Sequence, residues 1–378
     1  MKFFKYLFVL LSLILIVSCG GEEEDDWGND GDGGNSGNNE ENGGWESQEG
    51  QDWKILKTRG FTNIYSLTLG QNDTLYLGGT TLEDLYSDSL TETKKADALL
   101  VAFDTKGKEL WGKQWDVHKQ YDSVKNIVID KDGYIYISGG KHVTFVMKFA
   151  PDGTKIWEQF PEFDSIHSLA VDGAKNVYIS YESEIIKYSS DGKILQNYKV
   201  FGESSNPSGI NALAIDSKGN IYAGGDTYDS LFTDNAGKND AFLIKLAPDG
   251  TQLWGKQWGS DDEDYIYDLV IDEDNIYVGG LIFVEDTEIF LKFSPDGEKI
   301  WGQDKTSTSM IINNNEIYTI NNLRKGIVNK YDLDGKLIGS SPIYEQESFD
   351  KIAGDSKGNI YVRTTKNKII KFAPSDFK

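Results

Sequence analysis

Hydrophobic and polar residues follow one recurring pattern from residue 51 to the end of the chain. Each repeat contains an alternating apolar and polar stretch, a tight turn, and a second alternating stretch centred on a tyrosine. Alternation with a period of two is typical of half-buried β-strands, and turn sequences such as DKDG, DSKGN and PDG separate the stretches. No segment after residue 50 has helical length and period. The chain is therefore predicted to be all-β over residues 51–378.

The tyrosine-centred stretch occurs seven times, at intervals of 41 to 60 residues. Residues 97–115 and 240–258 show the repeat most clearly, because they share ten of nineteen positions. Copies of this length with four short strands each are typical of propeller blades. The central residues are Tyr76, Tyr136, Tyr178, Tyr222, Tyr277, Tyr318 and Tyr361.

The ends of the repeat region predict how the ring closes. Residues 51–58, QDWKILKT, match the fourth strand of a copy without the preceding three, and the last copy stops after its third strand. Joining them makes one complete blade and removes exposed sheet edges. The predicted fold is a seven-bladed β-propeller with four-stranded blades, closed by the N-terminal strand joining the C-terminal blade.

The repeat resembles the bacterial SBBP-type β-propeller repeat family, whose copies carry an Asp-rich start, a GNIYV-like strand with paired glycines and a DAFV-K-PDG-LW ending. The match extends over nearly all of residues 51–378. Copies three and six depart from it, because Tyr181 and Asn321 replace the paired glycines, and Leu195 and Ile338 stand near the tryptophan position. These two blades are expected to be less regular.

A second, weaker resemblance involves the phrase AFDTKGKELW, which is similar to the tryptophan-docking repeat of quinoprotein-type propellers. That family includes quinone-dependent dehydrogenases and a scaffold of outer-membrane protein assembly. Such dehydrogenases usually have eight blades and often adjacent cysteines, whereas this chain has seven copies and one cysteine. A dehydrogenase is therefore disfavoured, and an assembly scaffold stays an alternative.

Tryptophan recurs at one position in four copies. A ligand site would be expected in one or two blades, whereas a residue that recurs in most blades serves packing. We predict that these side chains fill the gap to the neighbouring blade, since aromatic side chains contribute strongly to cores. They are Trp111, Trp157, Trp254 and Trp301.

The first 50 residues differ in composition from the rest. Lys2 and Lys5 precede an apolar run from Leu7 to Val17, which is shorter than the ~20 residues that span a bilayer. The ending IVSCG resembles the lipobox of bacterial lipoproteins, in which the cysteine, here Cys19, carries lipid. An ordinary signal peptide with an incidental cysteine is the alternative. Cys19 is the only cysteine, so no disulfide framework is predicted.

Residues 1–18 are thus predicted to be a lipoprotein signal peptide, and residues 19–50 a lipidated cysteine with a disordered Gly/Asn/acid tether. The acid run EEEDD resembles export signals that place some Gram-negative lipoproteins on the cell surface; a solvated spacer is the alternative. The predicted location is the outer membrane, on the cell surface or the periplasmic face.

Net charge argues against nucleic acid as a partner. The whole chain carries −23, and residues 1–50 hold two lysines and eleven acids, which leaves −14 on residues 51–378. A body this acidic is repelled by phosphate backbones. The expected partners are the membrane through the lipid anchor and a protein or glycan ligand, and the chain is expected to be a monomer.

Loop length predicts which face of the propeller binds. In a four-stranded antiparallel blade, the loops between strands two and three and the connections between blades emerge on one face, here called the loop face. The short, uniform turns emerge on the other, here called the turn face. Insertions at 80–96 and 226–239 lengthen the loop face of copies one and four. Variable loops on a rigid scaffold tend to bind, with neutral drift as the alternative.

The candidate ligand-binding residues lie in these loops and connections, where aromatic side chains mixed with carboxylates suit sugars or peptides. They are Asp84, Tyr86, Asp88, His118, Tyr121, Asp122, Tyr228, Phe232, Asp234 and Tyr265. Asp261, Asp262 and Asp264 form an acidic cluster that could hold Ca²⁺, although it lacks the ligand spacing of a known calcium loop. No other cofactor is expected.

No catalytic constellation is evident. His118, His142 and His167 lack zinc-ligand spacing, no G-x-S-x-G elbow occurs, and the paired glycines do not precede helices. The sequence predicts a lipid-anchored, non-catalytic envelope propeller that binds a protein or glycan through its loop face. The alternatives are a periplasmic assembly scaffold, by analogy of fold, and a polysaccharide hydrolase or lyase, which would need two carboxyl groups about 5–9.5 Å apart.

Overall fold

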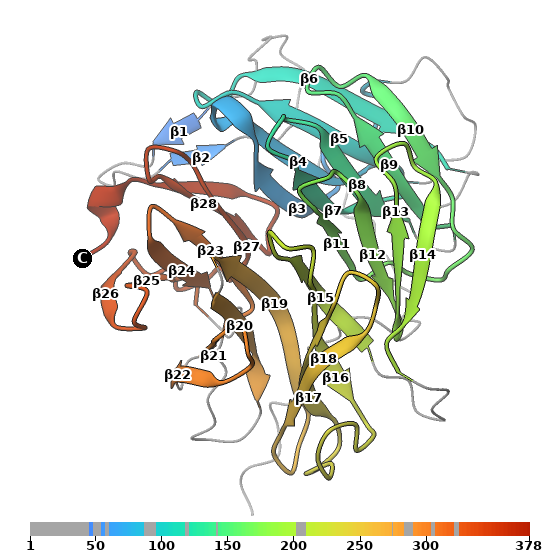
Figure 1. Ribbon diagram of the computed structural model, residues 1–378. Coiled ribbons are helices and arrows are strands. Elements are labelled where there is room, and N and C mark those ends of the chain that lie inside the picture. The colour runs from blue at the N-terminus through green and yellow to red at the C-terminus, as the bar shows by residue number, and fades with distance from the viewer. Residues whose placement is uncertain are drawn as a thin grey trace, which may run out of the picture. The chain divides into compact units, whose positions relative to one another are not determined.

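Seven antiparallel sheets make up the folded unit, which extends from Glu41 to Lys378. The computed structural model describes residues 45–47, 54–56, 60–86, 96–117, 121–140, 143–201, 209–273, 275–282, 290–303, 307–320 and 325–378. The first strand of each blade lies nearest the centre in Figure 1, and these strands contact one another in order around the ring. Contacts between the first and last of them close it, which confirms the predicted seven-bladed propeller.

Each of the first three blades contains four strands in chain order. Blade 1 has β3 (Asn63–Leu69), β4 (Leu75–Thr81), β5 (Asp97–Phe103) and β6 (Glu109–Trp115). Blade 2 has β7 (Val124–Ile129), β8 (Ile135–Gly139), β9 (Phe145–Phe149) and β10 (Lys155–Gln159). Blade 3 has β11 (Ser168–Val171), β12 (Val177–Tyr181), β13 (Glu184–Tyr188) and β14 (Ile194–Lys199).

The next three blades repeat this order. Blade 4 has β15 (Gly209–Ile215), β16 (Ile221–Thr227), β17 (Asp240–Leu246) and β18 (Gln252–Trp258). Blade 5 has β19 (Asp264–Asp272), β20 (Asn275–Ile282), β21 (Phe290–Phe293) and β22 (Lys299–Gln303). Blade 6 has β23 (Ser309–Asn313), β24 (Glu316–Ile320), β25 (Val328–Tyr331) and β26 (Leu337–Ser340).

Blade 7 combines both ends of the unit. It contains β27 (Phe349–Gly354), β28 (Ile360–Thr364) and β29 (Ile369–Phe372), and β2 (Lys54–Leu56) pairs antiparallel with β29 as the predicted fourth strand. A fifth strand, β1 (Trp45–Ser47), pairs with β2. The sequence did not predict this strand, because it lies in the segment 19–50 that was expected to be a disordered tether. Cys19 and the signal segment 1–18 lie outside the described residues.

Helical structure is confined to short 3₁₀ turns in the described ranges, η1 (Gln71–Asp73) and η2 (Pro374–Asp376). None of the helices there is long and apolar enough to cross a membrane.

An aspartate organises the turn between the first two strands of several blades. Asp172 shows the geometry: its Oδ1 accepts hydrogen bonds from the backbone N–H groups of Ala174 (2.9 Å) and Asn176 (2.8 Å). Its Oδ2 accepts one from the Tyr178 hydroxyl at 3.0 Å. The recurring Asp and Tyr of the sequence are therefore two ends of one hydrogen-bonded turn. Equivalent aspartates are Asp130, Asp216 and Asp355.

The recurring tryptophan joins each of blades 1, 2, 4 and 5 to the next blade, as predicted. The Trp254 indole donates to the Pro295 carbonyl at 3.0 Å, in the last turn of blade 5. Its ring covers Gly297, where a Cβ would lie 2.9 Å from the indole. Gly297 also has a left-handed φ of 80°. The same indole-to-carbonyl contact is made by Trp111, Trp157 and Trp301.

Blades 3 and 6 differ from the others, but not by the lower regularity expected from their sequences. In blade 3, Gln196 stands at the tryptophan position in the strand register, and Tyr198 donates its hydroxyl to the Pro248 carbonyl at 2.9 Å. The first strands of blades 3 and 6 pair regularly, whereas those of the other five blades contain a bulge. In blade 4 the bulge brings the Gly209 carbonyl against Gly225, where a Cβ would lie only 1.7 Å away. Glycine therefore permits this close approach in blade 4, although blade 7 forms an equivalent bulge with Thr364 at that position.

Gly297→Ala should lower the free energy of unfolding by about 1–3 kcal/mol, because alanine adds a Cβ beneath Trp254 at a left-handed φ. Urea denaturation measures the change. Gly173→Ala is the matched control, because a Cβ there would meet no atom within 4 Å, and it should change stability by less than about 0.5 kcal/mol. Equal losses in both variants would contradict the docking role of Trp254.

Candidate functional site

The long loop of blade 4 is held by a buried glutamine on the loop face. Gln257, 7% exposed, donates through Nε2 to the Asp229 carbonyl (3.0 Å) and to Asp240 Oδ2 (2.8 Å). Its Oε1 accepts the backbone N–H groups of Leu231 (2.7 Å) and Phe232 (3.0 Å). Three of these hydrogen bonds fix the first turn of the loop to β18, and the fourth ties β18 to the start of β17.

Blade 1 has the same device. Gln114 donates to the Glu83 carbonyl (3.0 Å) and Asp97 Oδ2 (2.7 Å), and it accepts the N–H groups of Leu85 (2.9 Å) and Tyr86 (3.3 Å). In the part of the chain that the structure describes, this clamp occurs only in blades 1 and 4. The same two blades are the ones with the complete LWGKQW phrase. The phrase recurs because it serves the same long loop in both blades.

Two predicted ligand residues pack within their own blades. The Phe232 ring lies over Gly255, where a Cβ would be 2.2 Å from the ring, and Tyr86 covers Gly112 in the same way at 2.1 Å. The Tyr86 hydroxyl also donates to Glu109 at 2.7 Å. Sequence alone gave no sign of this orientation, because the glycines that admit the rings are 23 and 26 residues away.

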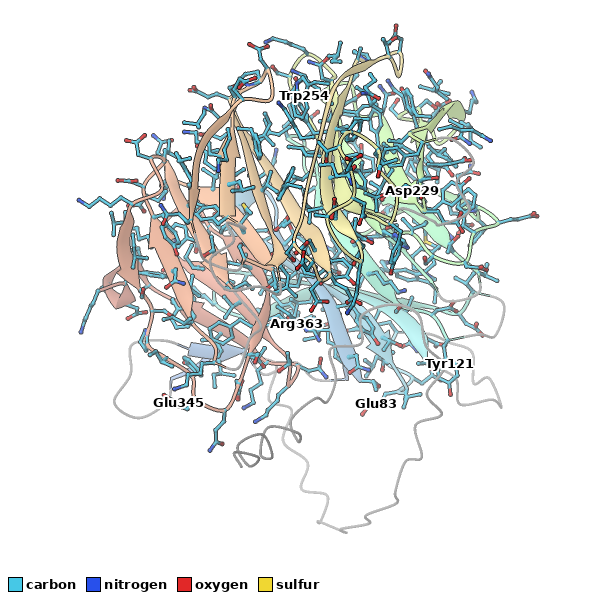
Figure 2. All side chains as sticks on the ribbon, turned by 90° about the horizontal axis from the view of Figure 1, so that it is seen from below. Glu83, Tyr121, Asp229, Trp254, Glu345 and Arg363 are labelled. Atoms are coloured by element: carbon cyan, nitrogen blue, oxygen red, sulfur yellow. The ribbon has the colours of Figure 1, made fainter. Side chains whose placement is uncertain are left out.

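Other predicted residues face solvent. Tyr121 is 55% exposed and Tyr228 47% exposed, and Asp84 and Asp234 are exposed as well. Figure 2 shows the side chains of this region, with Glu83 and Tyr121 labelled on neighbouring blades. The remaining candidates, Asp88 and His118, lie outside the described residues.

The acidic cluster after β18 does not converge on one point. Asp264 is buried and accepts the Ser260 hydroxyl at 3.1 Å, Asp262 pairs with Lys238 at 2.8 Å, and Asp261 is exposed. In the part of the chain that the structure describes, no three His, Cys, Asp or Glu side chains are grouped to hold a metal ion. Calcium binding here stays a prediction.

Asp122 occupies the equivalent position between blades 1 and 2. It is 1% exposed, its Oδ2 accepts the Val117 N–H at 2.6 Å, and its Oδ1 has no partner. Burial raises the pKa of Asp122 to about 7, with further contributions from the charges of Asp116 and Asp97 and opposition from the Val117 hydrogen bond. This candidate ligand residue is thus a strained buried acid.

A polar cluster lies on the loop face where blades 4 and 5 meet. Asp226 accepts the side-chain amides of Asn211 (2.9 Å) and Asn239 (3.2 Å). Tyr265 donates its hydroxyl to Glu263 at 3.0 Å and also contacts the Asn239 amide. Burial raises the pKa of Asp226, and the charge of Glu263 adds to that shift. The arrangement presents acceptor oxygens at the junction of β15, β16 and β19.

Of this cluster, only Tyr265 is predicted from the sequence as a ligand residue. A signal was nevertheless present in the repeat: Asp226 and Asn239 of blade 4 stand where blade 1 has Thr80 and Ala96. Because blade 1 folds without the Asp226 and Asn239 pair of blade 4, the fold does not require this pair.

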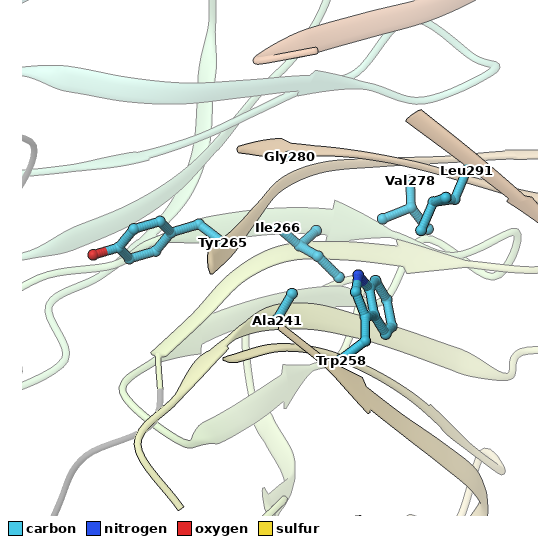
Figure 3. A pocket seen from close by; sticks show the side chains of 7 residues that line it. All are labelled: Ala241, Trp258, Tyr265, Ile266, Val278, Gly280 and Leu291. Carbon is cyan, nitrogen blue, oxygen red and sulfur yellow. The ribbon is translucent and has the colours of Figure 1, made fainter. Parts of the chain in front are cut away.

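A small apolar crevice lies beside the cluster, between residues of the same two blades. Ala241 and Trp258 line it from blade 4, and Tyr265 and Ile266 from blade 5. Figure 3 shows the Tyr265 hydroxyl pointing away from Trp258, so its ring forms the boundary between the crevice and the polar cluster.

Comparison with known proteins shows the fold alone. No protein-family model and no curated protein matches the chain. A chain in the crystal structure of the mitotic checkpoint complex has a TM-score of 0.62 at 10% identity, covering 84% of this chain and 94% of its own length. The Pan2 WD40 domain of Neurospora crassa has a TM-score of 0.57 at 13% identity, covering 82% and 88%. The chain is a β-propeller similar in architecture to these structures.

Asp122→Asn should stabilise the protein at pH 8. Because the folded pKa lies above the ordinary value of 3.8, the folded state binds the proton more tightly, so stability falls as pH rises from about 4 to about 7. Asparagine keeps the oxygen that accepts the Val117 N–H and cannot ionise. Its advantage should reach about 2–4 kcal/mol at pH 8 and disappear below pH 4.

Thermal unfolding across pH 4–8 measures this difference. The exposed Asp234→Asn variant should follow the parent at every pH. Parallel profiles for the parent and Asp122→Asn would show that Asp122 is not the buried acid responsible.

Proposed function

We propose that this protein is a lipid-anchored, non-catalytic propeller of the cell envelope that binds a protein or glycan through its loop face. Of these properties, the β-propeller fold is the one that the structure shows. The clamp that recurs in blades 1 and 4 carries the binding proposal. It uses the half-buried Gln114 and the buried Gln257 to hold the first turns of two long loops in fixed positions.

Preorganised loops are favourable for binding, because a rigid loop loses little entropy when a ligand associates. The clamped loops expose Leu82 (53%) and Tyr228 (47%) beside acidic residues such as Glu83 and Asp229. Apolar surface mixed with carboxylates suits a partner that offers both hydrogen-bond donors and apolar groups.

Membrane attachment is supported by the lipobox-like IVSCG and by the tether-like composition of the following segment. A Gly/Asn/acid-rich segment would separate the propeller from the bilayer and leave its loop face accessible. The surface and the periplasmic face are both compatible with this anchor.

Site-specific photo-cross-linking in the source cells tests the binding face. A benzophenone amino acid at Tyr228 should yield discrete adducts of higher mass, because this side chain projects from the loop face. The same probe at Lys193, an 80% exposed side chain in a turn of the opposite face, should yield none. Adducts from both positions, or from neither, would refute the proposal.

A loop replacement sharpens this experiment. Blade 3 joins β12 to β13 through only Glu182 and Ser183, so this fold accommodates a short loop there. Replacing residues 228–238 by that two-residue turn, with the probe moved to Leu82, shows whether the blade 4 loop is needed for the adduct.

Protease accessibility on intact cells tests the location. Cleavage without outer-membrane permeabilisation would place the propeller on the cell surface, and cleavage only after permeabilisation would favour the periplasmic assembly scaffold. Cys19→Ser should move the protein from the membrane fraction to the soluble fraction, and retention in the membrane would refute the lipid anchor.

A further inference from the structure

We propose that the loop-face cluster of Asp226, Asn239, Glu263, Tyr265 and Tyr267, here called the acceptor cluster, binds the side-chain cation of a lysine or arginine in a partner protein. This inference rests on the proposed function and names the chemistry of its ligand. Three strands or strand ends of blades 4 and 5, namely β16, the start of β17 and β19, contribute to the cluster.

The acceptor cluster contains oxygen atoms whose bonding capacity is incompletely used. Asn239 is fully buried, and although its Nδ2 donates to Asp226, its Oδ1 has no hydrogen-bond partner. A buried acceptor without a donor costs about 1–3 kcal/mol. Each oxygen of Asp226 accepts one amide hydrogen bond, and Glu263 accepts one hydroxyl. The site therefore lacks donors and would gain from a ligand that supplies several.

The negative charge of the cluster is also not balanced by an ion pair with a lysine or arginine in the described residues. Within the described residues, neither Asp226 nor Glu263 forms a salt bridge, although each forms the hydrogen bonds above. Lys238 interacts electrostatically with Glu263, but its ammonium pairs with Asp262 at 2.8 Å. An external cation would thus find two carboxylates that the protein's own cations leave available.

Aromatic rings indicate an organic cation rather than a metal ion. Tyr265 and Tyr267 stack with ring centroids 5.6 Å apart and an interplanar angle of 12°. Both belong to β19, the strand next to Glu263, and a bulge in this strand falls at Tyr267. Cations on an aliphatic stem bind well where carboxylates adjoin aromatic faces, since the π-system attracts the charge and the ring covers the stem.

A protein partner fits this site better than a simple amine. The apolar crevice between Ala241, Trp258 and Ile266 adjoins the ring of Tyr265, so an apolar neighbour of the cationic residue would have a surface to contact. Exposed Tyr228 and the clamped loop stand on the same face. Charged groups of one sign on such a face favour association with a partner of the opposite sign.

Peptide titration of the full-length protein tests the inference. The probes are acetyl-Gly-Lys-Gly-amide, acetyl-Gly-Arg-Gly-amide, acetyl-Gly-Gln-Gly-amide and glucosamine, measured by NMR at low salt. The Lys and Arg peptides should bind at least tenfold more tightly than the Gln peptide. Glu263→Gln should weaken Lys-peptide binding about tenfold, and Asp226→Asn should do the same.

Glu298→Gln is the matched control, because it removes the same charge from an exposed turn on the opposite face; binding should stay within twofold of the parent. Thermal unfolding verifies that each variant is folded. Equal binding of Lys and Gln peptides, no binding, or insensitivity to Glu263→Gln would overturn the inference.

Binding of glucosamine in preference to the peptides would also overturn it, in favour of an amino-sugar ligand. If cross-links from Tyr228 persist while the Lys peptide does not bind, only the cation inference fails. If those cross-links are absent, the proposed function itself fails.

Discussion

The docking of one blade on a carbonyl of the next is the interaction on which the ring depends. In blade 4, the Trp254 indole and the Lys245 ammonium both donate to the Pro295 carbonyl of blade 5, at 3.0 and 2.9 Å. The same convergence occurs at Ser190 and Leu333. Lys245 also lies 5.0 Å from the Tyr222 ring, which is fixed in turn by its aspartate turn. Blade and interface are thus stabilised by the same side chains, and small rotations between blades would break several contacts together.

The fourth strand of a blade serves both faces of the propeller at once. At its start, Trp254 docks on the turn face of the next blade, whereas near its end Gln257 fixes the loop on the other face. Between them, Gly255 admits Phe232, and Trp258 at the end packs 5.8 Å from Phe293. Because one short strand ties the loop to the ring, the long loops inherit the rigidity of the scaffold. This is the property that a binding surface needs and that an isolated loop of the same length would lack.

The loop face differs chemically from the rest of the molecule. The core and the turn face use recurring residues whose partners are internal, whereas Asp226, Asn239 and Glu263 form a cluster without an internal cation in the described residues. Asp122 shows what a buried acid costs when it serves packing alone, since burial raises its pKa to about 7. The same packing contacts recur in most blades, so a polar feature found in one blade is not required by the fold. Such features are the best candidates for ligand-binding sites.

The sequence alone determined the blade count, the closure by residues 54–56 and the packing role of the tryptophans, because these depend on strand period and on repetition, which are local and visible in one dimension. It also indicated that blades 3 and 6 would differ, since Tyr181 and Asn321 stand where blades 1, 2, 4 and 5 have a glycine beside the bulge. Only the tertiary structure decided that Phe232 and Tyr86 pack on glycines of their own blades, that β1 adds a fifth strand, and that Asp226, Asn239 and Glu263 meet. Those outcomes depend on which parts of the chain approach one another in space, and neither spacing nor composition encodes that approach.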